Sequence, residues 1–503
     1  QQLADHISRQ RFTEEEALRF MTVDFMQVIQ LLLRFHAFRN HIQVNQGPWQ
    51  IRLSKVQSDG YMDRASSDMS AYFVQYEKAF RNSELKLLHF YGKERTYQSW
   101  YGVPEALAKG NEQALEAHIA RNAYTPRQSE NLRSSDRRYN FYEYEDQVDN
   151  YGQGHAQAHW NELPGKGPWT LGASLHYTYG AGYFEQFEQD AGASTFGLPP
   201  LVLGADTISG GDAVQRRWLD NDFYGFNFRA LYEHGAFNVK TAVVANRYVG
   251  DHFGRLISAD FAPAGSFPEY YNGESVKDDL SGYVQTNFQR GAWLGFLDLQ
   301  FRQISYETAG TDNDLVEYDI DETYNFFNPK LGLQFTRQNW RAFLNFGVAN
   351  REPVRSDFLA RTEIADPQPE QLMNWEMGLE KSAADHRFSM NAFYMKYNDQ
   401  LLPTGELNDV GALVRRNIDE SYRAGVEISA EKNWLEKWFV RANATFMRSR
   451  LLDWTEPVID YGTGEVLIND FDESPIAMSP DIMAFAELEY RPLQDLSIRL
   501  RQQ

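Results

Sequence analysis

An alternation of apolar and polar side chains between residues 424 and 447 predicts a β-hairpin. In the first arm Val426, Ile428 and Ala430 share one face, and the residues between them are polar. The apolar positions of the second arm are Val440, Ala442, Ala444 and Phe446. Because Trp434 and Trp438 flank the turn, we expect two antiparallel strands whose ends carry large aromatic rings.

Two architectures contain hairpins of this kind. In a membrane β-barrel, the outer side chains meet lipid, the inner ones meet water, and aromatic residues gather at the strand ends. In a soluble all-β protein, the apolar face packs against a second sheet instead. The hairpin alone does not separate these alternatives.

The rest of the chain favours the barrel. Segments of about 8–12 residues with strand character recur from Trp49 onward, a length that suits tilted membrane strands. Short turns, such as residues 337–340 and 382–387, alternate with long polar segments, such as 306–325 and 448–480. Outer-membrane barrels have this asymmetry between their two ends. The predicted fold class is therefore all-β, a large antiparallel transmembrane β-barrel over residues 46–503.

Residues 1–45 differ in pattern and are left unassigned. Thr13 and Glu16 can form a capping box, which predicts a helix over residues 13–35. Arg19 and Asp24 interrupt this helix, so we do not expect it to span a membrane. The first residues contain no basic segment followed by an apolar one, and this decides nothing about export.

The composition of the chain excludes or disfavours several classes of function. No run of 18 apolar residues exists, so a membrane role requires a barrel. Aromatic residues make up 15% of the chain, which suits interfacial girdles. The chain has no cysteine, which excludes thiolate chemistry, and its net charge of -21 disfavours nucleic acid as a partner. We find no catalytic constellation and no phosphate-binding loop, so neither an enzyme nor a cofactor is expected.

A set of sequence motifs extends over roughly residues 45–500. They are VQSDGYMDRASSD at 56–68, GKERTYQSWYGVPE at 92–105, VDNYGQGH at 148–155, QRRWLDNDFYG at 215–225, NRYVGDHFG at 246–254, YNFFNPKLGL at 324–333, VANREPVRSDF at 348–358, NDQLLPTGELNDVG at 398–411, ESYRAGVE at 420–427 and SPDIMAFAELEY at 479–490. These motifs resemble those of TonB-dependent outer-membrane receptors of the Bacteroidota type, and they occur in the order used by that family.

The resemblance implies a barrel of 22 strands whose lumen holds a plug domain. Such a receptor imports a scarce nutrient, such as a siderophore or cobalamin, across the outer membrane with energy relayed by TonB. The implied partners are outer-membrane lipid, a TonB-type coupling protein and a small-molecule nutrient. No plug is recognisable, and the chain stops at Gln503 without the expected terminal aromatic strand, so the barrel is expected to be incomplete at its C-terminus.

A second interpretation of the function remains open. A receptor-like barrel without a recognisable plug could be a structural or docking subunit that does not transport. Its partners would then be a surface lipoprotein or a larger envelope complex.

Candidate ligand-binding residues are aromatic, histidine and arginine side chains. Tyr97, Trp100 and Tyr101 are predicted to lie on a long loop, where their rings can stack on a ligand or pack the loop. His155 and His159 are four residues apart and share a face if the strand is regular. They can bind a ligand or form part of a polar lumen wall. Arg351 can pair with a carboxylate in the lumen wall or, less directly, contact a ligand.

An acidic segment at 312–322 is the weak candidate for a metal site. Asp312, Asp314, Asp319 and Asp321 could attract a cation, but their spacing is not that of an EF-hand. A solvated extracellular loop explains the same residues.

Overall fold

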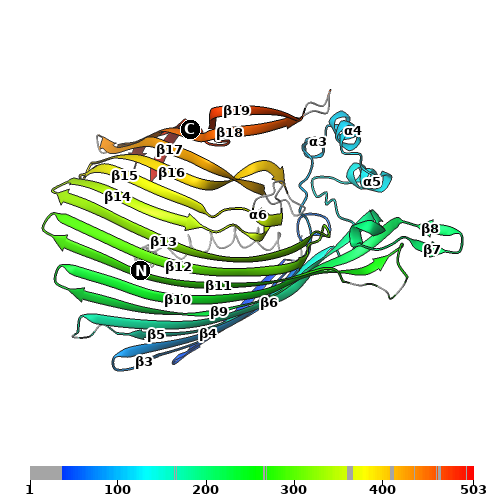
Figure 1. The fold of residues 1–503 in the computed structure, drawn as a ribbon, viewed down its shortest axis with the longest axis horizontal. Helices are drawn as coiled ribbons and strands as arrows, with labels where there is room; N and C mark the ends of the chain where they lie inside the picture. Colours follow the sequence, from blue (N-terminus) through cyan, green and yellow to red (C-terminus); the bar gives the residue numbers. More distant parts are fainter. Residues whose placement is uncertain are drawn as a thin grey trace.

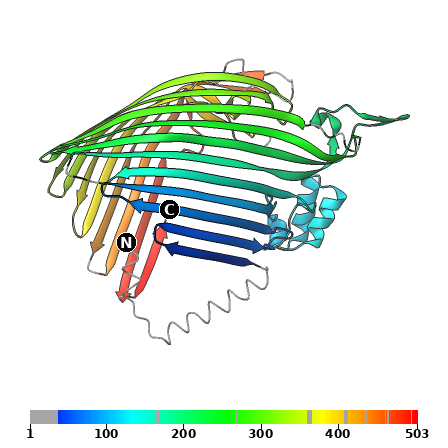
Figure 2. The ribbon, with the colours of Figure 1, turned by 90° about the horizontal axis from the view of Figure 1, so that it is seen from below.

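In the computed structural model, the described residues are 37–163, 165, 167–263, 265, 267, 269–359, 366–407, 413–434, 437–459, 462, 466–493 and 495–502. Nineteen strands form one antiparallel sheet, in which most strands pair with the strands that precede and follow them along the chain. The sheet curls into a barrel-like wall (Figures 1 and 2). The large antiparallel β-structure predicted from the alternation is confirmed.

The elements have the following bounds. The strands of the large sheet are β1 Phe38–Gln46, β2 Trp49–Ser58, β3 Ser67–Ala79, β4 Ser83–Tyr97, β5 Val148–Glu162, β6 Trp169–Gly192, β9 Gly210–His234, β10 Phe237–Ala259, β11 Glu269–Arg290, β12 Trp293–Thr311, β13 Glu317–Arg337, β14 Trp340–Arg351, β15 Glu370–Ser382, β16 His386–Leu407, β17 Leu413–Trp434, β18 Trp438–Ile459, β19 Val466–Pro475, β20 Ile482–Leu493 and β21 Leu496–Gln502. A separate hairpin consists of β7 Leu201–Leu203 and β8 Asp206–Ile208. The helices are α3 Glu105–Ala108, α4 Glu112–Arg121, α5 Pro126–Ser134, the short 3-10 helix η1 Ala193–Phe196 and α6 Arg355–Leu359.

The hairpin predicted between residues 424 and 447 is formed by β17 and β18, with Trp434 paired to Trp438 across the turn. Val426, which pairs with Phe446, and Ile428 are only half-buried. The only other sheet in the described part of the chain is the small β7–β8 hairpin. The apolar face of β17 therefore packs against no second sheet, which removes the soluble sandwich as an explanation.

A belt of apolar side chains surrounds the outer face of the wall. The register aligns the outward residues of β10, β11 and β12 in rows. The outward residues of these strands within the belt, which are mostly apolar with some threonine and glycine, are Phe237, Val239, Thr241, Val243 and Ala245, then Leu280, Gly282, Val284, Thr286 and Phe288, then Trp293, Gly295, Leu297, Leu299 and Phe301. The residues from Phe237 to Ala245 are enough for a tilted strand to cross the membrane, which takes about 9–11 residues.

Aromatic pairs mark the edge of this belt next to the short turns, which are at the left of Figure 1. We call this end of the wall the lower end and the opposite end the upper end. Across neighbouring strands, the ring centroids of five pairs lie 4.4–4.9 Å apart: Trp49–Tyr76, Trp169–Tyr232, Phe237–Phe288, Trp293–Phe335 and Trp438–Tyr490. Aromatic side chains, above all the amphipathic rings of Trp and Tyr, gather at the boundary between lipid and water. The short turns therefore lie at one membrane interface.

The strands continue well above the belt. The strands β9, β10 and β11 have 25, 23 and 22 residues, about twice the length that a membrane crossing needs. Directly above the belt, Arg247 of β10 faces Asp278 of β11 on the outer surface, with Nε and Oδ1 3.6 Å apart. Helices α3 to α5, the β7–β8 hairpin and α6 all lie at this upper end, which is on the right in Figure 1.

The strands extend much further into the two long polar segments than the sequence predicted. Residues 306–325 and 448–480 were expected to be long polar loops, but they belong largely to β12, β13, β18 and β19. Above the membrane both faces of a strand meet water, so the outer face becomes polar and the alternation that marks a membrane strand disappears.

Three further expectations concern the number of strands, the start of the barrel and the N-terminal helix. The described residues contain 19 sheet strands, compared with the 22 that the resemblance implies, and within them β1 is paired with β2 but not with β21. Strand β1 begins at Phe38, before the boundary predicted at residue 46. The helix predicted over residues 13–35 lies outside the described residues. No helix that the structure describes is long and apolar enough to cross a membrane.

Candidate functional site

A helical insertion, residues 98–147, projects from the upper end between β4 and β5. Helices α4 and α5 pack through Leu115, Ile119 and Leu132, all of which are buried. A complete capping box at Thr125 and Gln128 begins α5. The insertion therefore has an apolar core of its own and is an ordered unit on the rim.

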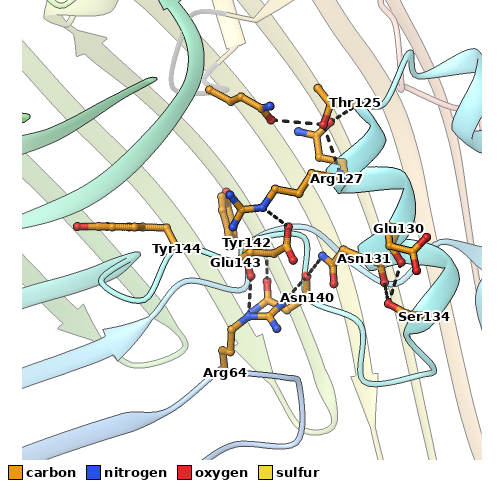
Figure 3. Close-up of polar contacts among 12 residues, drawn as sticks. Arg64, Thr125, Arg127, Glu130, Asn131, Ser134, Asn140, Tyr142, Glu143 and Tyr144 are labelled. Atoms are coloured by element: carbon orange, nitrogen blue, oxygen red, sulfur yellow. Dashed lines mark hydrogen bonds and ion pairs between the residues drawn. The ribbon is translucent and has the colours of Figure 1, made fainter. Parts of the chain in front are cut away.

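The β2–β3 loop holds this insertion through Arg64 (Figure 3). Its Nε donates to the backbone oxygen of Tyr142 at 2.8 Å, and Nη2 donates to that of Asn140 at 3.0 Å. Arg64 adopts a left-handed backbone with φ of 65°, which costs a non-glycine residue roughly 1–2 kcal/mol. The two charge-assisted hydrogen bonds offset that cost.

Asn140 is the centre of the attachment and is completely buried. Its Nδ2 donates to the backbone oxygens of Asp63, at 2.9 Å, and Gln98, at 3.1 Å, and its Oδ1 accepts from the Tyr142 amide at 3.1 Å. One side chain thus ties the β2–β3 loop to both ends of the insertion.

The opposite side of the insertion is attached to β6. The Tyr144 hydroxyl donates to Oε1 of the buried Glu185 at 2.6 Å, and Arg216 Nε donates to Glu185 Oε2 at 2.6 Å. Burial, and then the hydrogen bond to the Glu185 carboxylate, raise the pKa of Tyr144, so its hydroxyl remains a donor. The insertion is therefore fixed to the rim from two sides.

The three aromatic residues predicted on this loop have different environments. Tyr97 is buried at the end of β4, where its hydroxyl donates to the backbone oxygen of Tyr144 at 2.7 Å, which indicates a packing role. Trp100 and Tyr101 are each 57% exposed. Both rings contact Tyr142, at centroid distances of 6.3 and 5.6 Å. We refer to Trp100, Tyr101 and Tyr142 as the aromatic ridge.

A cavity of about 430 Å³, which we call the rim cavity, lies below the ridge at the upper end of the sheet. Phe184 links the two, because it lines the cavity and its ring lies 5.7 Å from that of Trp100. The other residues that give the cavity its chemistry are Arg217, His252 and Arg355, the rings of Tyr151 and Tyr318, and the carboxylates of Glu94, Asp149 and Asp312. Cationic, acidic and aromatic groups thus converge on one space, as in many small-molecule sites.

Sequence reasoning did not select the two arginines of this cavity. Arg217 lies on β9 with its guanidinium 5.8 Å from the centre of the Phe184 ring, and Arg355 lies on α6, 5.9 Å from that of Tyr318. The alternation of inward and outward side chains along β9 could have placed Arg217 on the inner face. Arg355, however, follows the end of β14, and its approach to β13 depends on how the chain turns there.

His155 and His159 share the inner face of β5, as the spacing predicted. His155 Nδ1 lies 2.8 Å from Thr178 Oγ1, and His159 Nδ1 lies 2.9 Å from Ser174 Oγ. Neither histidine lines the rim cavity. This geometry favours a hydrogen-bonded lumen wall over a ligand contact.

Arg351 lies at the upper end of β14, with its Nη2 3.6 Å from Glu370 Oε2. The stronger network of the same motif involves the next residue, Glu352, which is buried. Its carboxylate accepts from Lys277 at 2.7 Å and from Arg302 at 3.1 Å. The motif therefore contributes paired charges to the inner wall, as one interpretation of the sequence expected.

The four candidate metal residues do not come together. Asp312 accepts from the amides of Asp314 and Val316 and so closes the β12–β13 turn. Asp319 and Asp321 share the outer face of β13. Among the described residues, no group of three or more His, Asp or Glu is arranged to hold a metal ion.

The solved structures that resemble this fold include three receptors and transporters. They are the ferric-catecholate import receptor Fiu of Escherichia coli K12 in its closed form (14% identity, TM-score 0.54), the ferric citrate transporter FecA (13%, 0.55) and the siderophore receptor PiuA of Acinetobacter baumannii (11%, 0.54). The matches cover 92%, 92% and 91% of this chain and 68%, 61% and 68% of the respective receptors. Identities this low show a common fold. No curated protein sequence matches the chain.

Family membership follows from the sequence profile. The family described as TonB dependent receptor-like, beta-barrel, matches residues 64–501, which is most of the chain. The similar structures carry the names of receptors and transporters, and none is described as an enzyme. The Bacteroidota-type assignment stays a prediction. The chain belongs to the TonB-dependent receptor β-barrel family and is a protein of the outer membrane.

Proposed function

We propose that this chain forms the barrel of an importer that captures a scarce nutrient, such as a siderophore or cobalamin, outside the cell and passes it through its lumen. The observation that carries the proposal is the rim cavity, because it combines two guanidinium groups, carboxylates and rings at the upper end of a wall with a polar inner face. Fiu, FecA and PiuA are named for ferric-catecholate import, ferric citrate transport and siderophore reception, which supports the ligand class.

Energy for this import is proposed to come from a TonB-type partner. A barrel of this size encloses an aqueous space that must be closed when idle, so moving the closing element needs work. The outer membrane has no nucleotide supply, and the work therefore has to be relayed from the inner membrane.

Uptake assays test the proposal. A strain without the gene should lose uptake of at least one of three labelled probes, namely ferric citrate, a ferric catecholate complex and cyanocobalamin, and the intact gene should restore it. Collapsing the proton gradient with a protonophore should abolish the restored uptake. Restored uptake that survives the protonophore would contradict energy coupling, and no deficit for any probe would instead favour a structural or docking subunit.

The arginines of the rim cavity should affect ligand affinity. Replacing Arg217 and Arg355 together by alanine is expected to raise the half-saturating probe concentration at least tenfold, because a hydrogen bond to a charged group contributes about 1.5–3 kcal/mol. Arg229→Ala is the matched control: Arg229 lies on the inner face of the same strand, binds Asn161 Oδ1 at 2.7 Å and does not line the cavity. An equal loss in both variants would contradict the assignment.

A further inference from the structure

A second cavity of about 340 Å³, which we call the insertion cavity, lies between the helical insertion and β6. It shares no lining residue with the rim cavity. Its walls come from α5, the last residues of the insertion and residues 186–189 of β6. It is therefore a separate space above the membrane belt.

Aromatic rings cover part of this cavity. Tyr101 is 57% exposed, and its ring lies 4.7 Å from that of Phe141 at 50°. Phe187 approaches from the other side, stacked on Tyr144 at 5.9 Å. These rings offer flat apolar surfaces with little rotational freedom to lose on binding.

Polar groups without protein partners surround the rings. In the part of the chain that the structure describes, the side-chain nitrogens of Gln128, Gln186 and Gln189 have no hydrogen-bond acceptor, although all three residues line the cavity. The arginine of this cavity, in contrast, is paired with a carboxylate, because Arg127 Nε lies 3.1 Å from Glu143 Oε2. The cavity thus offers amide donors and carboxylate acceptors but no unmatched cation.

This chemistry differs from that of the rim cavity. The rim cavity is lined by two arginines, whose guanidinium groups suit an anionic chelate, whereas an uncharged ring with many hydroxyls needs flat apolar surfaces together with donors and acceptors. We propose that the insertion cavity is a saccharide-binding site, separate from the site proposed for the imported nutrient.

The attachment of the insertion prepares this site for binding. Arg64 holds the backbone at Tyr142, and Thr125 Oγ1 donates to Gln189 Oε1 at 3.3 Å, so the two walls are linked before a ligand arrives. A preformed site spends less of its binding free energy on ordering side chains. The proposal does not depend on transport.

Binding to the purified full chain tests the site. The probes are methyl β-D-glucopyranoside and maltotriose, and the detergent is an amine oxide without a sugar headgroup. Calorimetry and saturation-transfer NMR should detect saturable binding, which Tyr101→Ala should weaken about tenfold by removing one ring contact. Tyr101→Phe retains the ring and should retain the binding. No saturable binding of either probe would overturn the proposal.

Matched controls separate this site from its neighbours. Trp100 is as exposed as Tyr101 but does not line the insertion cavity, so Trp100→Ala should leave saccharide affinity unchanged. Arg217→Ala should also leave it unchanged while weakening the capture of the nutrient. Equal losses in the Trp100 and Tyr101 variants would overturn the proposed site.

Two sources offer this chemistry, a soluble oligosaccharide and a glycan anchored in the outer leaflet. Competition between maltotriose and detergent-solubilised lipopolysaccharide distinguishes them. Displacement of maltotriose by lipopolysaccharide identifies the anchored source, and the absence of displacement identifies the soluble one. Either result supports a saccharide site only if Tyr101→Ala weakens the binding of maltotriose by the expected factor of about ten.

Discussion

Replacing Val284 by lysine is expected to lower the free energy of unfolding by about 2–4 kcal/mol, because a lysine at the middle of the lipid-facing belt places a charge in hydrocarbon. Val284 is the central outward residue of β11, between Leu280 and Phe288, and its neighbours across the sheet are Thr241 and Leu299. Equilibrium unfolding of the barrel in lipid vesicles, followed by tryptophan fluorescence, measures the loss.

Gln285→Lys is the control for this experiment. Gln285 is the next residue along β11, so its side chain is on the inner face, where it lies opposite Asp298. A lysine there meets water and a carboxylate and should change stability by less than about 1 kcal/mol. If both substitutions cost the same, the assignment of outer and inner faces is wrong.

Asn140→Ala is expected to loosen the helical insertion while the barrel stays folded. The substitution leaves the backbone oxygens of Asp63 and Gln98 and the amide of Tyr142 without the partner that Asn140 provides. Each buried group left unsatisfied costs about 1–3 kcal/mol, and water that enters the site recovers part of this. A net loss of about 3 kcal/mol corresponds to local opening that is about 100-fold more frequent.

Limited proteolysis and amide exchange of residues 98–147 detect this opening. Peptides from β9 to β13 should exchange as in the unmodified chain. Asn122→Ala is the control within the insertion, because Asn122 is exposed and its hydrogen bonds are confined to the end of α4. If the control loosens the insertion equally, Asn140 is not the residue that holds it.

The alternation of side chains predicted the fold where a strand has lipid on one side and water on the other. Val426 and Ile428 identified the β17–β18 hairpin because a strand with one apolar and one aqueous side has a strict period of two. The same pattern placed His155 and His159 on one face of β5. It failed for residues 306–325, which lie largely in strands above the membrane and have water on both sides.

The sequence alone determined the strand pattern, the membrane belt and the location of Trp100 and Tyr101 in a long connection, because these depend on residues close together in the chain. Only the tertiary structure decided that Arg64 holds Tyr142, that Arg217 and Arg355 face one cavity, and that Gln186 and Tyr101 line another. Contacts of this kind join loops far apart in the chain. They depend on the curvature of the sheet and on how each loop packs over the rim, and local periodicity contains no information about either.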